Sequence, residues 1–567
     1  MSRFKNMRLT AILIAAVVVL AAVAVSLFVL DEFPAYRYYV AVPNTGTSLS
    51  VVLEIDNPVF SKTGVVSLYE GDKQIRVTGC ADAAGRPAGK PYTDSGMLFI
   101  TVGRGSRTLV SYTAGIAALG KHGNRGDITG DYAVFDGDEA LLLPYSAYDY
   151  KPGSDRKVLM GGIGFSFDLP PGWKQIIPRS DVKNPRWADI YGITQDAFVF
   201  GKFTKVSGTS PGLSAFALAS GDVPSRETVD GFNSLYAYYA NLFGSAPDLY
   251  NIVALPKPGP DTPQVIGGAG KGSVAASFDP DLLRDWQLLA HRMFHAFFDT
   301  AAPYAALHIA PNTWFNEGLA TYYENMSMGA LPDSLRRRVG ADPNRQFALL
   351  FDCYLYMRTK DPLVYNYPPM REDELPSEGA REFMHYTTAP LLVKLLGDQA
   401  LGNGAQPDAA LKYCVANGAK FDERFVAFDT ATALLGADAG QKFCETYLLN
   451  AGVPPLWNLK PYQPPDEDVL AALNGIEYVQ GTWFKLDDPN YHTDTVTMDD
   501  LRAAEASLSN EPAAFVMPGM KSSLMDYSMP VYALLNDYYY HAKQKGISYD
   551  DPELRKKMFA GATDAGQ

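Results

Sequence analysis

The chain has 567 residues, a formal net charge of -14 and a hydrophobic content of 47%. Such a length exceeds one hydrophobic core and predicts several domains, and the apolar content excludes a mostly disordered protein. The negative charge, without a Lys/Arg-rich run, argues against a nucleic-acid partner, because phosphate binding needs a clustered cationic surface.

The N-terminus predicts a single-pass membrane anchor. Basic residues within 1–8 precede an uncharged run over 9–30, which is long enough to cross a bilayer core as a helix. The basic flank places residues 1–8 in the cytoplasm as a short tail and the bulk of the chain outside the cytoplasm. A cleaved signal peptide ending at Ala22-Val23-Ala24 is the alternative, but the apolar run continues past this site and favours an anchor.

Residues 35–205 predict an antiparallel β domain of sandwich or saddle form. Short β-branched and aromatic runs there are separated by Gly, Pro, Asn and Asp, and helical periodicity is absent. The expected strands are Tyr36–Val42, Ser48–Ile55, Gly64–Tyr69, Met97–Val102, Thr108–Tyr112, Ala140–Leu143 and Ile163–Leu169.

Residues 225–450 predict a second, mostly helical domain, which makes the protein α+β and multidomain. A helical pattern over Thr228–Phe243 is followed by a strand at Tyr250–Leu255, a Gly-rich edge strand within Val265–Phe278, and several helices. Prolines between residues 453 and 465 predict a linker. The small mixed region 466–567, with short strands between Tyr478 and Phe484, has no readable role.

The four cysteines, Cys80, Cys353, Cys414 and Cys444, show no C-x-x-C spacing. This spacing predicts neither a zinc knuckle nor a dense disulfide framework. One bridge, Cys414 to Cys444, stays open.

A helix predicted from Asp279 to about Thr300 carries two histidines one turn apart. The capping pattern Asp279-Pro280-Asp281 marks its start. Apolar residues recur at three- and four-residue steps and form a core face, which leaves His291 and His295 together on a neighbouring face. Zinc enzymes use this spacing because a rigid helix presets the separation of two imidazoles. Ordinary hydrogen-bonded histidines are the alternative.

A second predicted helix, Asn312–Glu324, offers Glu317 as a third ligand. Its run W-F-N-E-G-L-A-T-Y-Y-E resembles the second metal-binding helix of aminopeptidase N-type and glycyl aminopeptidase-type gluzincins. The resemblance implies a thermolysin-like catalytic domain, zinc as cofactor, peptide or protein as ligand, and His291, His295 and Glu317 as metal ligands. Glu324 matches the carboxylate that orients a ligand imidazole in that family.

Two further positions follow from the resemblance. Tyr386 matches the tyrosine that stabilises the tetrahedral intermediate, although the Lys-Gly expected after it is Thr388-Ala389 here, and an ordinary buried helix residue is the alternative. Gly267 and Gly268, within Gly267–Gly270, resemble the glycine-containing edge strand that binds the substrate backbone by β-pairing.

The family motif H-E-x-x-H reads His291-Arg292-Met293-Phe294-His295 in this chain. The missing glutamate is the general base, a contribution of about 10² to 10⁴ in rate, and a guanidinium stays protonated and cannot replace it. A fixed cation beside the ligands also opposes zinc binding.

Three hypotheses follow from this substitution. The favoured one is a pseudopeptidase that binds peptide or protein, with Arg292 pairing Glu317 or binding a substrate carboxylate. The second is a divergent zinc peptidase that takes its base from another carboxylate, with Asp285, Asp299 and Glu324 as candidates. The third is a structural envelope scaffold whose interactions lie in the β domains.

Overall fold

The structure is a computed structural model of the whole chain. It describes residues 33–70, 74–88, 91–116, 119–120, 123–124, 126–144, 162–177, 197–255, 265–266, 272–302, 307, 310–360, 365–376, 378–417, 426–459, 476–479 and 482–485. The predicted cytoplasmic tail 1–8 and anchor 9–30, and most of region 466–567, lie outside these residues. Within the described part of the chain, no helix is both long and apolar enough to cross a bilayer.

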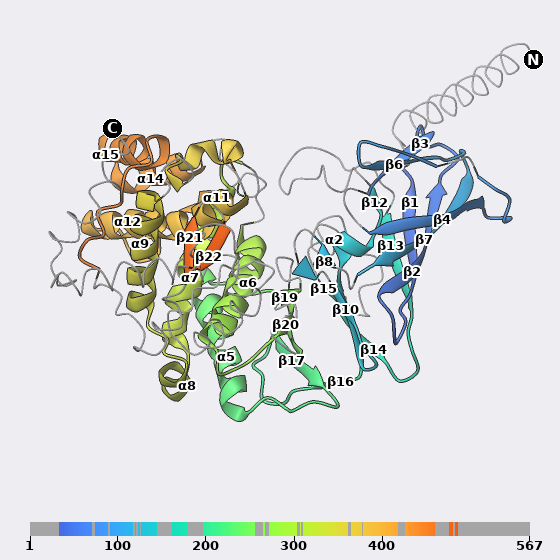
Figure 1. The fold of residues 1–567 in the computed structure, drawn as a ribbon, viewed down its shortest axis with the longest axis horizontal. Helices are drawn as coiled ribbons and strands as arrows, with labels where there is room; N and C mark the ends of the chain where they lie inside the picture. Colours follow the sequence, from blue (N-terminus) through green and yellow to red (C-terminus); the bar gives the residue numbers. More distant parts are fainter. Residues whose placement is uncertain are drawn as a thin grey trace, which may run out of the picture.

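The N-terminal half is a β domain that lies beside a mostly helical half (Figure 1). Its largest sheet has the order β13-β1-β2-β7-β4, with β1 at Ala35–Ala41, β2 at Ser48–Asn57, β4 at Ile75–Asp82, β7 at Ser106–Gly115 and β13 at Gly162–Asp168. A second sheet, β12-β3-β6-β5, comprises Leu143–Pro144, Val65–Tyr69, Met97–Thr101 and Tyr92–Asp94. A third, β10-β11-β15-β14, comprises Gly126–Ile128, Tyr132–Asp136, Ala197–Gly201 and Lys174–Ile177. Leu119–Gly120 and Gly123–Asn124 form the short pair β8-β9.

Alternation of buried and exposed side chains explains these strands. In β1, Tyr36, Tyr38 and Val40 are buried while their neighbours are more exposed, as expected for a strand with one face on a core. The predicted strands near residues 36, 48, 64, 97, 108 and 163 are confirmed to within a few residues.

Two predictions for this domain are wrong. The domain is not purely antiparallel, since β13 pairs parallel to β1 with Ala35 opposite Gly162. The strand predicted at Ala140–Leu143 is instead the end of helix α2 (Gly137–Ala140) followed by the two-residue strand β12. The four residues 140–143 are all buried, so their apolar run reflects burial on all sides, which a strand and a turn of helix share.

The second half is built on a five-stranded sheet of order β16-β17-β18-β20-β19. Strands β17 (Leu213–Leu218), β18 (Tyr250–Leu255) and β20 (Ser273–Ser277) run parallel, and the edge strand β19 (Val265–Ile266) is antiparallel to β20. Strand β16 (Phe203–Lys205) also belongs to this sheet, so the sheet begins before residue 225, where the change to helical texture was predicted.

The three helices predicted over Thr228–Phe243, from Asp279 to about Thr300 and over Asn312–Glu324 correspond to α5, α6 and α7. Helix α5 spans Arg226–Phe243, with Ser225 as N-cap and Gly244 as a left-handed C-cap. The others are α6 (Leu283–Ala301), α7 (Thr313–Ser327), η2 (Met328–Ala330), α8 (Asp333–Arg338), α9 (Pro343–Lys360), η3 (Pro369–Glu374), α11 (Glu378–Phe383), the π-helix η4 (Met384–Thr388), α12 (Ala389–Gly402), α13 (Ala409–Asn417), α14 (Val426–Leu435), α15 (Ala437–Phe443) and the π-helix η6 (Cys444–Leu449).

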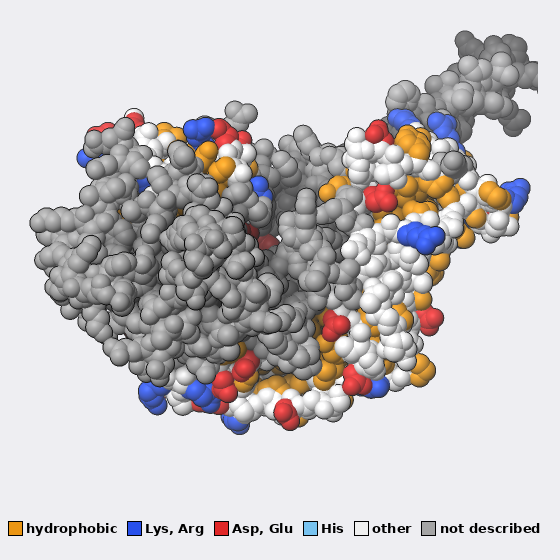
Figure 2. Space-filling view, viewed as in Figure 1, with side chains coloured by type: hydrophobic (Ala, Val, Ile, Leu, Met, Phe, Trp, Pro, Cys, Tyr) orange, Lys and Arg blue, Asp and Glu red, His pale blue; other side chains and the backbone are white. Residues whose placement is uncertain are grey.

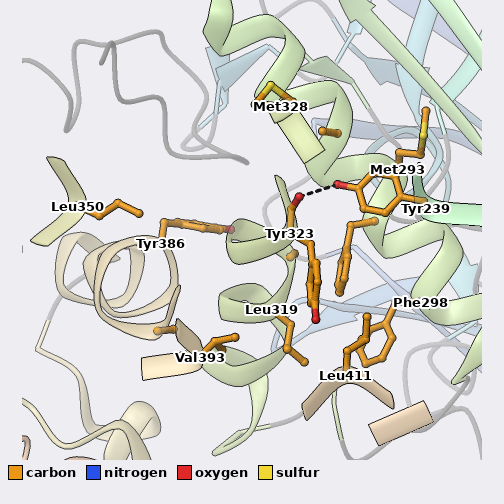
Figure 3. Close-up of a cluster of buried hydrophobic side chains, with 14 of the residues drawn as sticks. Tyr239, Met293, Phe298, Leu319, Tyr323, Met328, Leu350, Tyr386, Val393 and Leu411 are labelled. Carbon is orange, nitrogen blue, oxygen red and sulfur yellow. Dashed lines mark hydrogen bonds between the residues drawn. The ribbon is translucent and has the colours of Figure 1, made fainter. Parts of the chain in front are cut away.

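The core of this half joins helices that are distant in sequence. Figure 3 shows Tyr239 of α5, Met293 and Phe298 of α6, Leu319 and Tyr323 of α7, and Tyr386 of η4 around one cluster. The Tyr239 hydroxyl donates to the Tyr323 carbonyl at 3.3 Å. Burial on this scale stabilises the packing of α5, α6 and α7 and so sets the relative positions of their polar side chains.

The structure also tests the predictions for the cysteines, for the strands near residues 478–484 and for the surface charge. The four cysteines are free, so the bridge between Cys414 and Cys444 is absent. The short strands predicted near Tyr478 and Phe484 are β21 (Ile476–Val479) and β22 (Thr482–Lys485), which pair antiparallel. On the described part of the face in Figure 2, Lys and Arg side chains are interspersed with Asp and Glu side chains instead of forming one cationic field.

Candidate metal centre

Helix α6 begins four residues later than the sequence predicts. Residues 279–282 form a turn in which the Asp281 backbone N–H donates to Asp279 Oδ1 at 2.9 Å and the Asp279 N–H donates to Asp285 Oδ2 at 2.8 Å. The carboxylates therefore satisfy the turn, and the first helical residue is Leu283. The predicted core face is confirmed, with Trp286, Met293 and Phe297 fully buried.

His291 and His295 lie one turn apart and deep inside the domain. Their side chains come from α6, and the residues are only 1% and 4% exposed. The two Nε2 atoms are 3.1 Å apart, so both imidazoles turn the same nitrogen toward one point. The i, i+4 spacing on a rigid helix is sufficient to explain this approach.

Glu317 of α7 completes the group. Its Oε2 lies 3.2 Å from His291 Nε2 and 3.3 Å from His295 Nε2. Ligands held at about 2 Å from one tetrahedral ion are separated from each other by roughly 3.3 Å. The three distances therefore match a common ion, and the three donor atoms form a group that could hold a metal.

Glu324 holds the orientation of His291. Its Oε2 lies 3.0 Å from His291 Nδ1, and both side chains are buried. When Nδ1 donates to the Glu324 carboxylate, the Nε2 lone pair of His291 faces Glu317, and a cation between these two acceptors stabilises them. This contact matches the role that the family resemblance gives Glu324.

Burial and mutual charge interactions shift the pKa values of His291, Glu317 and Glu324. Burial lowers the pKa of His291 to about 3, and the charges of His295 and Arg292 act in the same direction. The hydrogen bond that His291 makes to Glu317 and the negative charge of Glu317 act against this lowering of the pKa. Burial opposes ionisation of Glu317, but His295 and His291 together hold its pKa well below the usual range. Burial and the charge of Glu317 raise the pKa of Glu324. Ionised Glu317 and neutral His291 are the forms that bind a metal.

Tyr386 lies at this site, on the π-helix η4. Its ring centroid is 5.9 Å from that of His291. Burial raises the pKa of the Tyr386 phenol well above its usual range, and the charge and hydrogen bonding of Glu317 add to this effect. A neutral phenol next to a metal ligand can donate a hydrogen bond, which is the function of the tyrosine that Tyr386 matches. π-Helical turns are frequent at functional sites.

Arg292 is partly buried and does not pair with Glu317, contrary to one prediction. The carboxylate of Glu317 is occupied by the two histidines, and the ion pairs of the described residues include none between Arg292 and Glu317. The Nε of Arg292 is buried and lacks a hydrogen-bond partner. Its positive charge reaches both His291 and Tyr386.

The alternative bases lie elsewhere or are occupied. Asp285 binds the turn before α6. Asp299 lies eight residues beyond His291 on the same helix, or about 12 Å along its axis. Glu324 is bonded to His291 Nδ1. None of the three is placed to take a proton from a water bound at the centre.

Gly267 and Gly268 lie outside the described residues. The strand that precedes them, β19, lies at an edge of its sheet. The single edge strand predicted over Val265–Phe278 is wrong, because β20 (Ser273–Ser277) lies between β18 and β19.

A buried pair, His385 and Glu372, connects the N-terminus of α7 to the helical turn that carries Tyr386, and the sequence does not reveal it. His385 Nε2 lies 2.5 Å from Glu372 Oε1, and Glu372 Oε2 accepts from the backbone N–H of Trp314 at 3.3 Å. Glu372 thus serves the N-terminus of α7, where an acid is favoured, and His385 links it to the helical turn that carries Tyr386. The sequence offers only one hint, the position of His385 directly before Tyr386.

Gly318 permits the close approach of α7 to α12. A Cβ at Gly318 would lie 2.6 Å from the Cβ of Ala389 and 3.0 Å from its carbonyl carbon. Only glycine fits this contact without displacement of a helix. Because Gly318 directly follows Glu317, its close contact with α12 helps to set the position of α7 from which the Glu317 carboxylate contacts the two histidines.

Neither a protein-family model nor a curated protein matches the chain. Among solved structures, an aminopeptidase N family protein from Idiomarina loihiensis matches with a TM-score of 0.52 and 15% identity, over 78% of each chain. An M1 zinc metallopeptidase from Deinococcus radiodurans matches with a TM-score of 0.45 and 17% identity, over 76% of this chain and 96% of that one. A variant of the Deinococcus protein bound to a Tyr-Ser-Ala substrate matches with a TM-score of 0.41 and 17% identity, over 73% and 93%. At such identities the likeness shows the fold, and the Idiomarina match confirms the aminopeptidase-like gluzincin fold that Trp314–Glu324 predicts.

Proposed function

We propose that this protein is a membrane-anchored metallopeptidase homologue that binds zinc and a peptide or protein ligand at the same centre without efficient hydrolysis. The observation that carries the proposal is the convergence of His291, His295 and Glu317 on one point, with Arg292 in the place of the general base.

Zinc is the metal that fits this group best. Two imidazole nitrogens and one carboxylate oxygen are a common donor set for zinc, and three protein ligands leave a fourth position open for water or a ligand. The contact between Glu324 and His291 Nδ1 supplies the outer hydrogen bond that zinc-binding histidines usually have. The zinc would polarise a carbonyl or carboxylate oxygen bound at the open position.

The replacement of the family's general base by Arg292 supports a pseudopeptidase. Arg292 cannot accept a proton, and Asp285, Asp299 and Glu324 are held away from the open position. Loss of a positioned base lowers the rate by about 10² to 10⁴. One observation favours the alternative of a slow, divergent zinc peptidase, namely the placement of Tyr386 beside Glu317, where a stabiliser of the tetrahedral intermediate is needed.

The purely structural scaffold is the weakest of the three hypotheses. A scaffold needs no convergence of three ligating side chains, and burying two imidazoles with two carboxylates is costly unless a function retains them. The site therefore supports a metal-binding function over packing alone.

Zinc analysis tests the first part of the proposal. We expect the full-length chain, purified in mild detergent and dialysed against zinc, to hold about one zinc per chain by mass spectrometry. Glu317→Gln should lose most of it, whereas Glu445→Gln, an exposed glutamate on η6, should not. A zinc-free native protein with an intact melting transition would overturn the metal assignment.

Hydrolysis is tested on the same samples. With a fluorogenic peptide library, the zinc-loaded chain should show turnover no higher than its Glu317→Gln variant. Robust turnover that Glu317→Gln removes would replace the pseudopeptidase by the divergent peptidase.

The membrane anchor at residues 9–30 is part of the proposal and needs its own test. Full-length protein should float with vesicles after carbonate washing, and protease added from the extracytoplasmic side should digest the domains. A chain that carbonate releases would instead favour the cleaved signal peptide.

A further inference from the structure

Among the residues that the structure describes, none accepts a hydrogen bond from the buried Nε of Arg292, which lies beside the metal centre. Its position is set by α6, one residue after His291, and its Nε is buried without a hydrogen-bond partner. The two carboxylates of the metal centre have other partners, since Glu317 faces both histidines and Glu324 faces His291. The buried Nε of Arg292 is therefore open to an acceptor supplied by a ligand.

We infer that Arg292 binds a carboxylate group of the ligand, whose oxygens lie between the guanidinium and the open position of the metal centre. A guanidinium presents parallel N–H donors that match the two oxygens of a carboxylate, and such charge-assisted pairs are among the strongest hydrogen bonds in proteins. The inference rests on the proposed function, because it names the ligand of the same site.

The neighbouring groups fit an anion and disfavour a cation. Tyr386 is a neutral donor next to Glu317, and the positive charge of Arg292 extends to both Tyr386 and His291. A peptide amino group would meet this positive charge and be repelled. The ligand chemistry is therefore a carboxylate, supplied either by a peptide C-terminus or by an acidic side chain.

Paired peptides distinguish the two sources. We would titrate the zinc-loaded, full-length protein with fluorescent peptides that differ only in a free or an amidated C-terminus, and with an amidated peptide that carries one internal Glu. We expect the free carboxylate, or the internal Glu, to strengthen binding about tenfold over the uncharged amide. Equal binding of all three peptides by zinc-loaded protein would overturn the inference.

Variants separate this inference from the proposed function. Arg292→Gln should retain zinc and abolish the preference for the carboxylate, while Arg337→Gln, an exposed arginine of α8, should change neither. Zinc content and the melting temperature are measured on each sample. Absence of zinc from native protein refutes the proposed function, whereas zinc with no dependence on Arg292 refutes only the carboxylate site.

A second, independent inference concerns one end of the β domain. Loop 58–65 and turn 103–106 lie side by side there and together form what we call the β tip. Buried Asn57 joins them, because its Nδ2 donates to the Thr63 carbonyl at 2.9 Å and to the Gly103 carbonyl at 3.1 Å. A Cβ at Gly105 would lie 2.9 Å from Val59, which shows how closely the two loops pack.

The β tip exposes apolar and basic side chains together. Val59, Phe60 and Val65 are 65%, 56% and 50% exposed, and exposed apolar side chains gathered at one place mark a surface that contacts a partner or a membrane. Lys62 and Arg104 are exposed on the same two loops. Apolar side chains flanked by cations are typical of surfaces that contact anionic lipid headgroups.

Strand register places the β tip close to the chain's entry into the domain. Ala35 pairs with Asp56, directly before Asn57, and Asn57 pairs with Ser106. Figure 1 shows β3, which follows the loop, at this end of the β domain. Five residues separate position 30 from position 35, and an extended chain of that length spans at most about 18 Å. A bilayer anchor at residues 9–30 would therefore hold the β tip near the extracytoplasmic surface of the membrane that it crosses.

We propose that the β tip contacts the lipid surface, with Val59, Phe60 and Val65 at the level of the headgroups. This inference rests on the proposed anchor. To test it, an environment-sensitive fluorophore is attached at Phe60→Cys in full-length protein that also carries Cys80→Ser, since the other three cysteines are buried. Val223→Cys, an equally exposed position before α5, is the matched control.

In vesicles of phosphatidylcholine and phosphatidylglycerol, we expect spin-labelled lipid to quench the fluorophore at position 60 at least twofold more than at position 223. Flotation of the vesicles reports the anchor separately. Protein that floats without preferential quenching at position 60 refutes the β tip alone, and a blue shift without quenching would assign this surface to a second copy of the chain. Protein that does not float refutes the anchor.

Discussion

Gly318→Ala tests whether the site depends on close packing of α7 against α12. The added Cβ would lie 2.6 Å from the Ala389 Cβ and 3.0 Å from its carbonyl carbon, whereas ordinary contact begins at 3.4 Å. Helix α7 must then withdraw by about 0.8 Å, because backbone atoms of α12 cannot rotate away. Overpacking of this kind costs about 1 to 3 kcal/mol.

The same shift affects the metal centre, because Glu317 immediately precedes Gly318. Metal–ligand distances tolerate only about 0.2 Å, so a displacement of this size should weaken zinc binding by about 10- to 100-fold. Chelator competition measures the zinc affinity, and thermal unfolding of the metal-free protein measures the packing cost. Both should change together.

Gly397→Ala is the matched control for this experiment. Gly397 lies inside α12 and a Cβ there would meet nothing within 4 Å. Removing a helical glycine without a clash should stabilise the protein by about 0.5 to 1 kcal/mol and leave zinc binding unchanged. If Gly318→Ala behaves like Gly397→Ala in both assays, the reasoning about the close approach of α7 is refuted.

Four further outcomes are expected. Arg292→Glu restores the family motif, and it should tighten zinc binding and raise peptide hydrolysis by about 10² to 10⁴ in a fluorogenic assay; no gain would mean that more than the base has been lost. Glu324→Gln should weaken zinc binding by about 10- to 100-fold in chelator competition, and unchanged affinity would contradict its contact with His291. His385→Ala removes the imidazole partner of buried Glu372, which keeps only the Trp314 N–H, and denaturant unfolding should show a loss of about 1 to 3 kcal/mol; no measurable loss would show that the pair is dispensable. Removing zinc with a chelator should lower the melting temperature of the native chain and not that of Glu317→Gln, because a ligand bound only to the folded state stabilises it.

Local patterns in the sequence predicted most of the elements. Helix α5 and strand β18 lie within two residues of their predicted bounds, since hydrophobic periodicity and capping residues are properties of neighbouring positions. The start of α6 was predicted too early because the carboxylate of Asp285 is used by the preceding turn, which the capping pattern does not reveal. The run at residues 140–143 was misread because burial on all sides removes periodicity.

Long-range contacts could not be derived from those patterns. The parallel pairing of β13 with β1 joins residues more than a hundred positions apart, and no local signal specifies that partner. The pair of Glu372 and His385 and the contact of Gly318 with Ala389 likewise join residues of different helical segments, and no local signal specifies them. Each depends on how separate helices pack, and packing responds to the shapes of many side chains together.

By itself, the sequence determined that two imidazoles share one face of one helix, because a helical repeat places residues 291 and 295 one turn apart wherever that helix lies. It also determined that Arg292, one of the three residues between them, bears a permanent positive charge. Only the tertiary structure decided that Glu317 and not Arg292 meets the imidazoles, that Glu324 takes His291 Nδ1, and that Tyr386 arrives from another helix. The reason is that the backbone repeat fixes neighbours within a helix, whereas contacts between helices are fixed by burial of their apolar faces.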